Sequence, residues 1–135
     1  MDQSIVQALM ARITALEADV SALNRKDVPL KGAWVAPTLL NGWVNFGAAQ
    51  VAGYWLDALG VVHLRGLIKS GTVNTVIFTL PAGYRPTALS LFSVVSNTGA
   101  ALVASRLDVA TTGDVTLVTG GNTFLSLDGV SFRTS

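Results

Sequence analysis

The sequence contains no cysteine and only one histidine, His63, in 135 residues. Disulfides, thiolate nucleophiles and cysteine-ligated zinc are therefore excluded, and one chain cannot supply two histidine ligands to a metal. From residue 34 onward the only carboxylates are Asp57, Asp108, Asp114 and Asp128. Three of these lie in predicted turns, where aspartate is common because its side chain hydrogen-bonds to the nearby backbone. We expect no enzyme, no cofactor and no metal site.

Charged residues are also scarce. They make up 13% of the chain, against about 25% in an ordinary soluble domain. The nine basic and eight acidic residues are scattered, so the basic footprint of a nucleic-acid-binding protein is missing. A small domain this poor in charge would expose apolar patches as a monomer. We therefore expect neighbouring subunits, not nucleic acid, to cover much of its surface.

Long apolar runs are missing as well. No stretch approaches the roughly 18 consecutive apolar residues of a membrane span. A signal peptide has a basic region followed by an apolar run, and the N-terminus has no such pattern. We expect no membrane insertion, and a role outside the cell would require another route of release, such as lysis.

The most regular pattern in the chain is a heptad repeat near the N-terminus. Apolar residues recur there at alternating spacings of three and four, which is typical of a coiled-coil seam. The a positions are Val6, Ile13 and Val20, and the d positions are Leu9, Leu16 and Leu23. One helix cannot bury such a stripe alone. We predict a helix over residues 3–24, capped by Asp2 or Ser4, with a stalk at 1–24, a linker at 25–33 and a head at 34–135.

The number of helices in the stalk is indicated by several features. β-Branched residues at a with leucine at d favour a parallel dimer. Ile5 and Met10 widen the stripe, and the segment 12–17, which begins with Arg12 and ends with Glu17, resembles a short trimerisation motif of parallel coiled coils. In that motif the arginine pairs with the glutamate of a neighbouring helix. We predict a homotrimer, with a dimer, a surface helix of a globular domain and an engineered zipper as alternatives.

The sequence pattern of the head is typical of an all-β domain. Valine, threonine and aromatic residues form short runs, and turn residues interrupt them every eight to twelve positions. We predict a β-sandwich, jelly-roll-like, preceded by the α-helical coiled coil. The expected strands lie near 34–36, 43–47, 51–57, 60–69, 73–80, 88–96, 101–109, 114–119, 122–127 and 129–133. The expected hairpins turn at 57–60 and 110–114, and residues 127–130 suggest a tight type I′ turn.

The strand at 60–69 carries the most informative alternation. Val62, Leu64 and Ile68 share the face that points into the core, whereas His63 and Arg65 lie on the opposite face. That polar face is a subunit interface or a ligand site, and both interpretations stay open here.

Aromatic residues offer flat apolar surfaces on which sugar rings stack. Tyr54 and Trp55 are adjacent in a strand, so their side chains face opposite ways. For a glycan site we predict Trp43 or Trp55 as the platform. The predicted polar contacts are Asp57, His63 and Arg65.

Residues 53–57 (GYWLD), 60–72 (GVVHLRGLIKSGT) and 78–86 (FTLPAGYRP) resemble a segment of the head domains of tailed-bacteriophage fibres and receptor-binding proteins. A short helical stalk before a β head is also similar to the baseplate receptor-binding proteins of phages that infect lactococci. The resemblance implies a virion protein, a homotrimer whose heads bind host cell-surface saccharide without metal or catalysis. It also implies docking to other virion proteins through the N-terminal helix. The alternative is a capsid decoration or head-fibre protein.

Overall fold

The computed structural model describes residues 2–27 and 33–135. The chain divides into two units, Met1–Lys31 and Gly32–Ser135. Most of the predicted linker, residues 28–32, lies outside the described residues.

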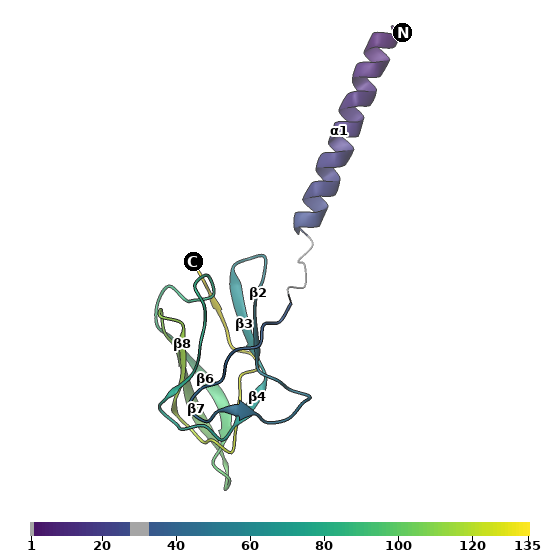
Figure 1. Cartoon of the computed structure of the whole chain (residues 1–135). Coiled ribbons are helices and arrows are strands. Elements are labelled where there is room, and N and C mark those ends of the chain that lie inside the picture. Colours follow the sequence, from purple (N-terminus) through teal and green to yellow (C-terminus); the bar gives the residue numbers. More distant parts are fainter. Residues whose placement is uncertain (1, 28–32) are drawn as a thin grey trace. The chain divides into compact units, whose positions relative to one another are not determined.

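The first unit contains one helix, α1 (Gln3–Asp27), drawn in purple in Figure 1. The Asp2 carboxylate caps its start, since Asp2 Oδ1 accepts a hydrogen bond from the Ser4 backbone N–H at 3.0 Å. This hydrogen bond also lowers the pKa of the Asp2 carboxyl. The helix is longer than predicted and includes Arg25 and Lys26, because both are good helix formers and the chain reaches Pro29 only after Asp27.

Every predicted seam residue from Val6 to Val20 has an exposed side chain in the single chain. A groove runs along this face beside Ile13, Leu16 and Val20. The side chain of Leu23 lies outside the described part of the structure. Within the helical unit, the seam is therefore an uncovered apolar surface.

The second unit is built from two antiparallel sheets, whose strands are labelled in Figure 1 where there is room. The seven-stranded sheet has, in spatial order, β1 (Val44–Asn45), β4 (Leu67–Lys69), β9 (Phe124–Ser126), β6 (Ser90–Asn97), β7 (Leu102–Val109), β8 (Asp114–Thr119) and β5 (Val76–Thr79). The three-stranded sheet has β10 (Ser131–Arg133), β3 (Val61–Arg65) and β2 (Gly53–Leu56).

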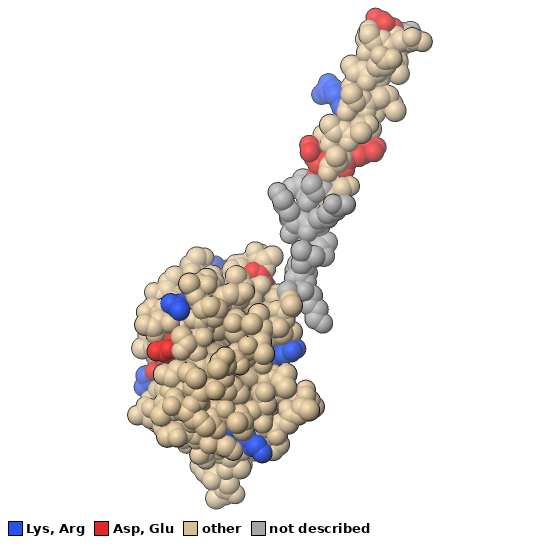
Figure 2. Space-filling model, viewed as in Figure 1, with Lys and Arg blue, Asp and Glu red and all other residues tan. Residues whose placement is uncertain are grey.

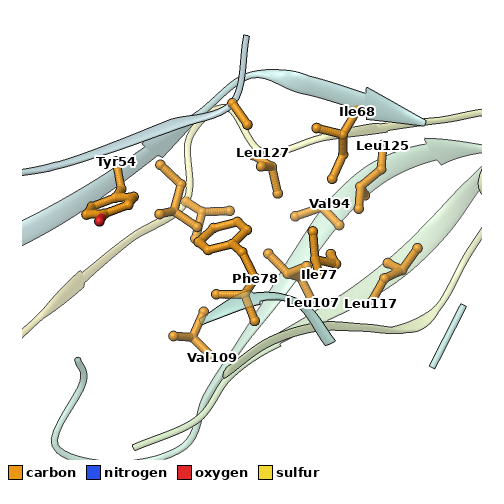
Figure 3. Packing of buried hydrophobic residues seen from close by; sticks show 14 of the residues in the cluster. Tyr54, Ile68, Ile77, Phe78, Val94, Leu107, Val109, Leu117, Leu125 and Leu127 are labelled. Carbon is orange, nitrogen blue, oxygen red and sulfur yellow. The ribbon is translucent and has the colours of Figure 1, made fainter. Parts of the chain in front are cut away.

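Both sheets contribute side chains to one hydrophobic core (Figure 3). Phe78, Leu107 and Leu125 come from the larger sheet, and Tyr54 and Val62 from the smaller. The prediction of a mainly β head is confirmed. The described head has ten strands, divided seven and three, whereas a jelly roll has eight.

The predicted strand at 60–69 is in fact two strands that belong to different sheets. The change occurs at Gly66, where φ is +116° and a Cβ atom would lie 2.6 Å from the Cα of Ala52. Only glycine fits so close to a neighbouring backbone in that conformation. The prediction of one continuous strand was wrong, but its alternation was right, since Val62 and Ile68 are buried on either side of the break.

The hairpin turns at 57–60 and 110–114 are confirmed. They join β2 to β3 and β7 to β8, with Gly60 and Gly113 at positive φ. The type I′ turn predicted at 127–130 is wrong, because such a turn needs positive φ at both central residues and only Gly129 has it. This turn connects β9 to β10, which lie in different sheets.

Candidate functional site

The outer face of the three-stranded sheet carries most of the predicted site. In the register of β2 and β3, Trp55 lies opposite His63 and Gly53 lies opposite Arg65. Residues directly opposite each other in antiparallel strands point to the same side of the sheet. Tyr54, between them, is buried in the core on the other side, as predicted.

A further aromatic residue joins this face from outside the strands. Val35 pairs with Tyr54 in an isolated bridge. This bridge is the only β-pairing described for the strand predicted at 34–36. Because side chains alternate along an extended chain, this bridge places Trp34 on the side of Trp55. The two indole rings meet edge to face, with centroids 5.8 Å apart.

Five side chains on this face form one continuous series of contacts, which we call the aromatic ladder. The Arg65 guanidinium lies 4.2 Å from the centroid of Trp34, and Trp34 contacts Trp55. Trp55 in turn stacks on His63, with centroids 5.1 Å apart and planes at 22°. His63 Nε2 donates a hydrogen bond of 2.8 Å to Asp57 Oδ2. The aromatic and cation–π contacts contribute about 0.5–1.5 kcal/mol each, so the ladder holds its aromatic side chains in place.

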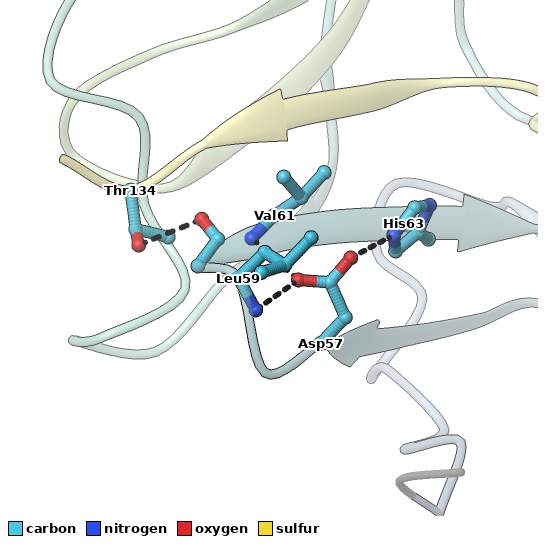
Figure 4. A network of polar contacts seen from close by, with 6 residues as sticks. Asp57, Leu59, Val61, His63 and Thr134 are labelled. Atoms are coloured by element: carbon cyan, nitrogen blue, oxygen red, sulfur yellow. Dashed lines mark hydrogen bonds and ion pairs between the residues drawn. The ribbon is translucent and has the colours of Figure 1, made fainter. Parts of the chain in front are cut away.

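Asp57 ends the ladder and closes the β2–β3 turn (Figure 4). Its Oδ1 atom accepts hydrogen bonds from the backbone N–H groups of Leu59 at 2.8 Å and Val61 at 3.0 Å. The hydrogen bond from His63, followed by that from Val61, lowers the pKa of the Asp57 carboxyl. Asp57 is therefore ionised at neutral pH and orients the imidazole of His63.

Arg65 ends the ladder on the other side. Opposite it, Gly53 has no side chain, and a Cβ atom there would lie 3.3 Å from Arg65 Nε and 3.4 Å from Trp34. The glycine thus leaves the space in which the guanidinium lies over the indole. With the side chains described for residues 2–21 and 33–135, Arg65 makes no side-chain hydrogen bond or ion pair. Its N–H donors have no partner among these residues.

Four of the five predicted site residues therefore lie together: Trp55, Asp57, His63 and Arg65. Trp43 does not join them. Its side chain is 2% exposed in the core and packs so closely on Gly71 that a Cβ atom there would lie 2.0 Å from the indole. A buried indole offers no face to a sugar ring, so the choice of Trp43 as a platform was wrong.

The sequence pattern does not single out Trp34. It lies twenty-one positions before Trp55 in the printed sequence, and no periodicity joins the two. The Val35–Tyr54 bridge brings Trp34 next to Trp55. This bridge is a tertiary contact that local sequence does not predict.

The ladder can stack on a flat apolar ring and hydrogen-bond to hydroxyl groups around it. His63 is 36% exposed and Asp57 16%, so the face is accessible at its centre. No group of three potential metal ligands occurs among the described residues. No helix among the described residues combines the length and the apolar character that crossing a membrane requires.

A second notable surface lies on the outer side of the seven-stranded sheet. Leu91, Val95, Leu102 and Ala104, which we call the β6–β7 outer face, all point away from the core. The ion pair between Arg106 and Asp108 lies on the same side of these strands. Leu102 is 65% exposed. Figure 2 shows how few charged groups interrupt the visible face of the head. Apolar patches of this kind mark contact surfaces between proteins.

No protein-family model matches this sequence, and no curated protein matches it. Among solved structures, the chain is similar to the crystal structure of the receptor binding protein (gp15) of Listeria phage PSA. The TM-score is 0.70 and 22% of residues are identical, over 95% of this chain and 78% of that one. The head unit, Gly32–Ser135, is shorter than 95% of the chain, so the match includes residues of the helical unit. The predicted resemblance to phage receptor-binding proteins is confirmed as a likeness of fold.

Proposed function

We propose that this chain is a phage virion adhesion protein whose heads bind host cell-surface saccharide without catalysis. The observation that carries the proposal is the aromatic ladder, accessible on a head whose fold is similar to that of a phage receptor binding protein. Aromatic rings flanked by planar polar groups are well suited to the apolar faces and hydroxyls of sugars.

The polar groups of the ladder favour binding over chemistry. Both oxygens of Asp57 are engaged by the protein itself, so this carboxylate orients His63 and is not placed as a nucleophile or a general acid. No second carboxylate belongs to the ladder, although glycoside hydrolysis ordinarily needs a pair. The ladder therefore supports binding of a saccharide without chemical change to it.

The oligomer in this proposal is a homotrimer joined by a parallel coiled coil. Two separate apolar surfaces support association, namely the exposed seam of α1 and the β6–β7 outer face of the head. Arg12 and Glu17, the two ends of the segment that resembles a trimerisation motif, both belong to α1. Three heads would raise a weak single-site affinity through avidity. The N-terminal helix is also the part we propose to dock on other virion proteins.

Binding to purified cell-wall polysaccharide tests this function. The full-length trimer should bind a glycan array or cell-wall preparations of Gram-positive hosts, and the Trp55→Ala variant should lose at least tenfold in apparent affinity at an unchanged trimer mass. Asp114→Asn, on the seven-stranded sheet and away from β6, is the control and should bind normally. No binding by the wild-type chain across such a panel would overturn the proposal.

The other function considered is capsid decoration. Immunogold labelling of intact virions separates the two, because an adhesion protein should be found on the tail or baseplate. Label confined to the capsid shell would favour decoration and contradict host attachment.

A further inference from the structure

A small cavity adjoins the Arg65 end of the aromatic ladder. It has a volume of about 190 Å³ and lies between the segment 49–51, Gly66 and Asp128. Arg65 belongs both to this cavity and to the ladder. The cavity is smaller than the roughly 300–1,000 Å³ of a site for a drug-sized molecule, so it holds one small ring.

The walls of the cavity are fixed by hydrogen bonds between segments that are distant in sequence. Gly66 N–H donates to Asp128 Oδ1 at 2.8 Å, and Leu67 N–H donates to the backbone carbonyl of Gln50 at 2.9 Å. Leu127 N–H donates to the Gly66 carbonyl at 2.8 Å. A ligand would therefore enter a cavity that is already formed, which lowers the entropic cost of binding.

Two polar side chains at the cavity have hydrogen-bonding groups that the described protein does not use. Arg65 retains its N–H donors, as described above. Asp128 uses Oδ1 for Gly66, whereas its Oδ2 atom accepts no hydrogen bond from a described residue. Both residues line the cavity, and they bring unused donors on one side chain and an unused acceptor on the other.

We propose that this cavity binds a single neutral pyranose ring, as the specificity pocket of the saccharide site. The inference rests on the proposed function and adds the class of sugar. Adjacent hydroxyl groups both donate and accept hydrogen bonds, so one ring satisfies Asp128 Oδ2 and Arg65 together. The rest of the saccharide then extends over Trp34 and Trp55.

The charge of the cavity determines the choice of a neutral sugar. A phosphate or uronate group would pair well with Arg65 alone. The Asp128 carboxylate in the same small cavity would repel it. A neutral ring avoids this repulsion and uses both side chains.

An NMR titration of the ¹⁵N-labelled full-length protein tests the proposal. The probes are the methyl glycosides of glucose, galactose, mannose and N-acetylglucosamine, with glucose 6-phosphate and methyl glucuronide as charged counterparts. At least one neutral glycoside should shift the Gly66 amide resonance in a saturable way. Its affinity should be at least tenfold higher than that of either charged sugar. Tighter binding of the charged sugars would overturn the assigned class.

The decisive variant is Asp128→Asn. Asparagine keeps the Oδ1 acceptor for Gly66 N–H but replaces the free oxygen with a donor NH₂ group. We expect an unchanged melting temperature and at least tenfold weaker binding of the neutral glycoside. Asp114→Asn, a turn aspartate of the other sheet bonded to Thr79, is the matched control and should bind normally.

A second variant, Ala49→Trp, fills the mouth of the cavity without touching Asp57 or His63, and should also abolish binding of the glycoside. If both variants bind glycoside and cell wall normally while Trp55→Ala does not, the pocket is refuted and the proposed function stands. If the wild-type protein binds no cell-wall saccharide at all, the proposed function itself fails.

Discussion

The imidazole of His63 stacks on the indole of Trp55, with centroids 5.1 Å apart and planes 22° apart. The same imidazole donates a hydrogen bond to Asp57, the residue that closes the β2–β3 turn. His63 therefore connects an aromatic surface to a carboxylate fixed by backbone N–H groups. Its ring cannot rotate without losing one of these contacts, so the centre of the ladder is ordered before any ligand binds.

His63→Ala should abolish most adsorption to host cells while leaving the trimer intact. The substitution removes the stacking partner of Trp55 and the group that Asp57 orients, and we expect binding to cell wall to weaken about tenfold or more. Adsorption assays and light scattering measure the two effects separately. Normal adsorption by an intact His63→Ala trimer would remove His63 from the site.

Acid should loosen the β2–β3 turn below the usual titration range of aspartate. The pKa of Asp57 is lowered in the folded chain, so its stabilising effect is complete above the unfolded value of about 3.9. This effect is lost as the pH falls through the lower, folded value. The amide resonances of Leu59 and Val61 should shift together in that range and should not do so in Asp57→Asn. A midpoint above about 4 would contradict the hydrogen bonding described here.

Gly66→Ala should be strongly destabilising. A Cβ atom at Gly66 would lie 2.6 Å from Ala52 Cα at φ +116°, so both the backbone conformation and the contact with the neighbouring segment oppose it. We expect a loss of about 3 kcal/mol or more in the free energy of unfolding. Gly83→Ala is the control, since φ is +93° there but nothing lies within 4 Å, and it should cost about 1–2 kcal/mol. Equal costs in denaturant unfolding would show that the close approach at Gly66 is unimportant.

The residues that sequence analysis placed well are those governed by local periodicity. Alternation between Tyr54 and Trp55 assigned their opposite faces correctly, and the buried set in β3 followed from the same rule. Trp43 shows the limit of that reasoning. Its sequence neighbours do not reveal that Gly71 packs against its indole, and such a contact between segments decides whether a tryptophan is core or platform.

Gly66 shows a second limit. The pattern from 60 to 69 alternates without interruption, and a glycine inside it is compatible with an ordinary strand. The sheet changes there because the backbone at Ala52 leaves no room for a Cβ atom, and this proximity exists only in the folded head. The cavity beside Arg65 depends on the same approach of segments, together with Asp128, so no spacing in the sequence predicted it.

Replacing Ile13 and Leu16 with glutamine should destroy the homotrimer. Both residues lie on the exposed seam of α1, and each side chain buried in a coiled coil contributes about 1.5–3 kcal/mol per helix. Light scattering should give three times 14.1 kDa for the wild-type chain. The double variant should lose this species and aggregate, because the β6–β7 outer face is then uncovered. Ala11→Gln with Ala18→Gln, outside the seam, is the control and should stay trimeric. A soluble, folded monomer from the seam variant would show that the head needs no neighbouring subunit.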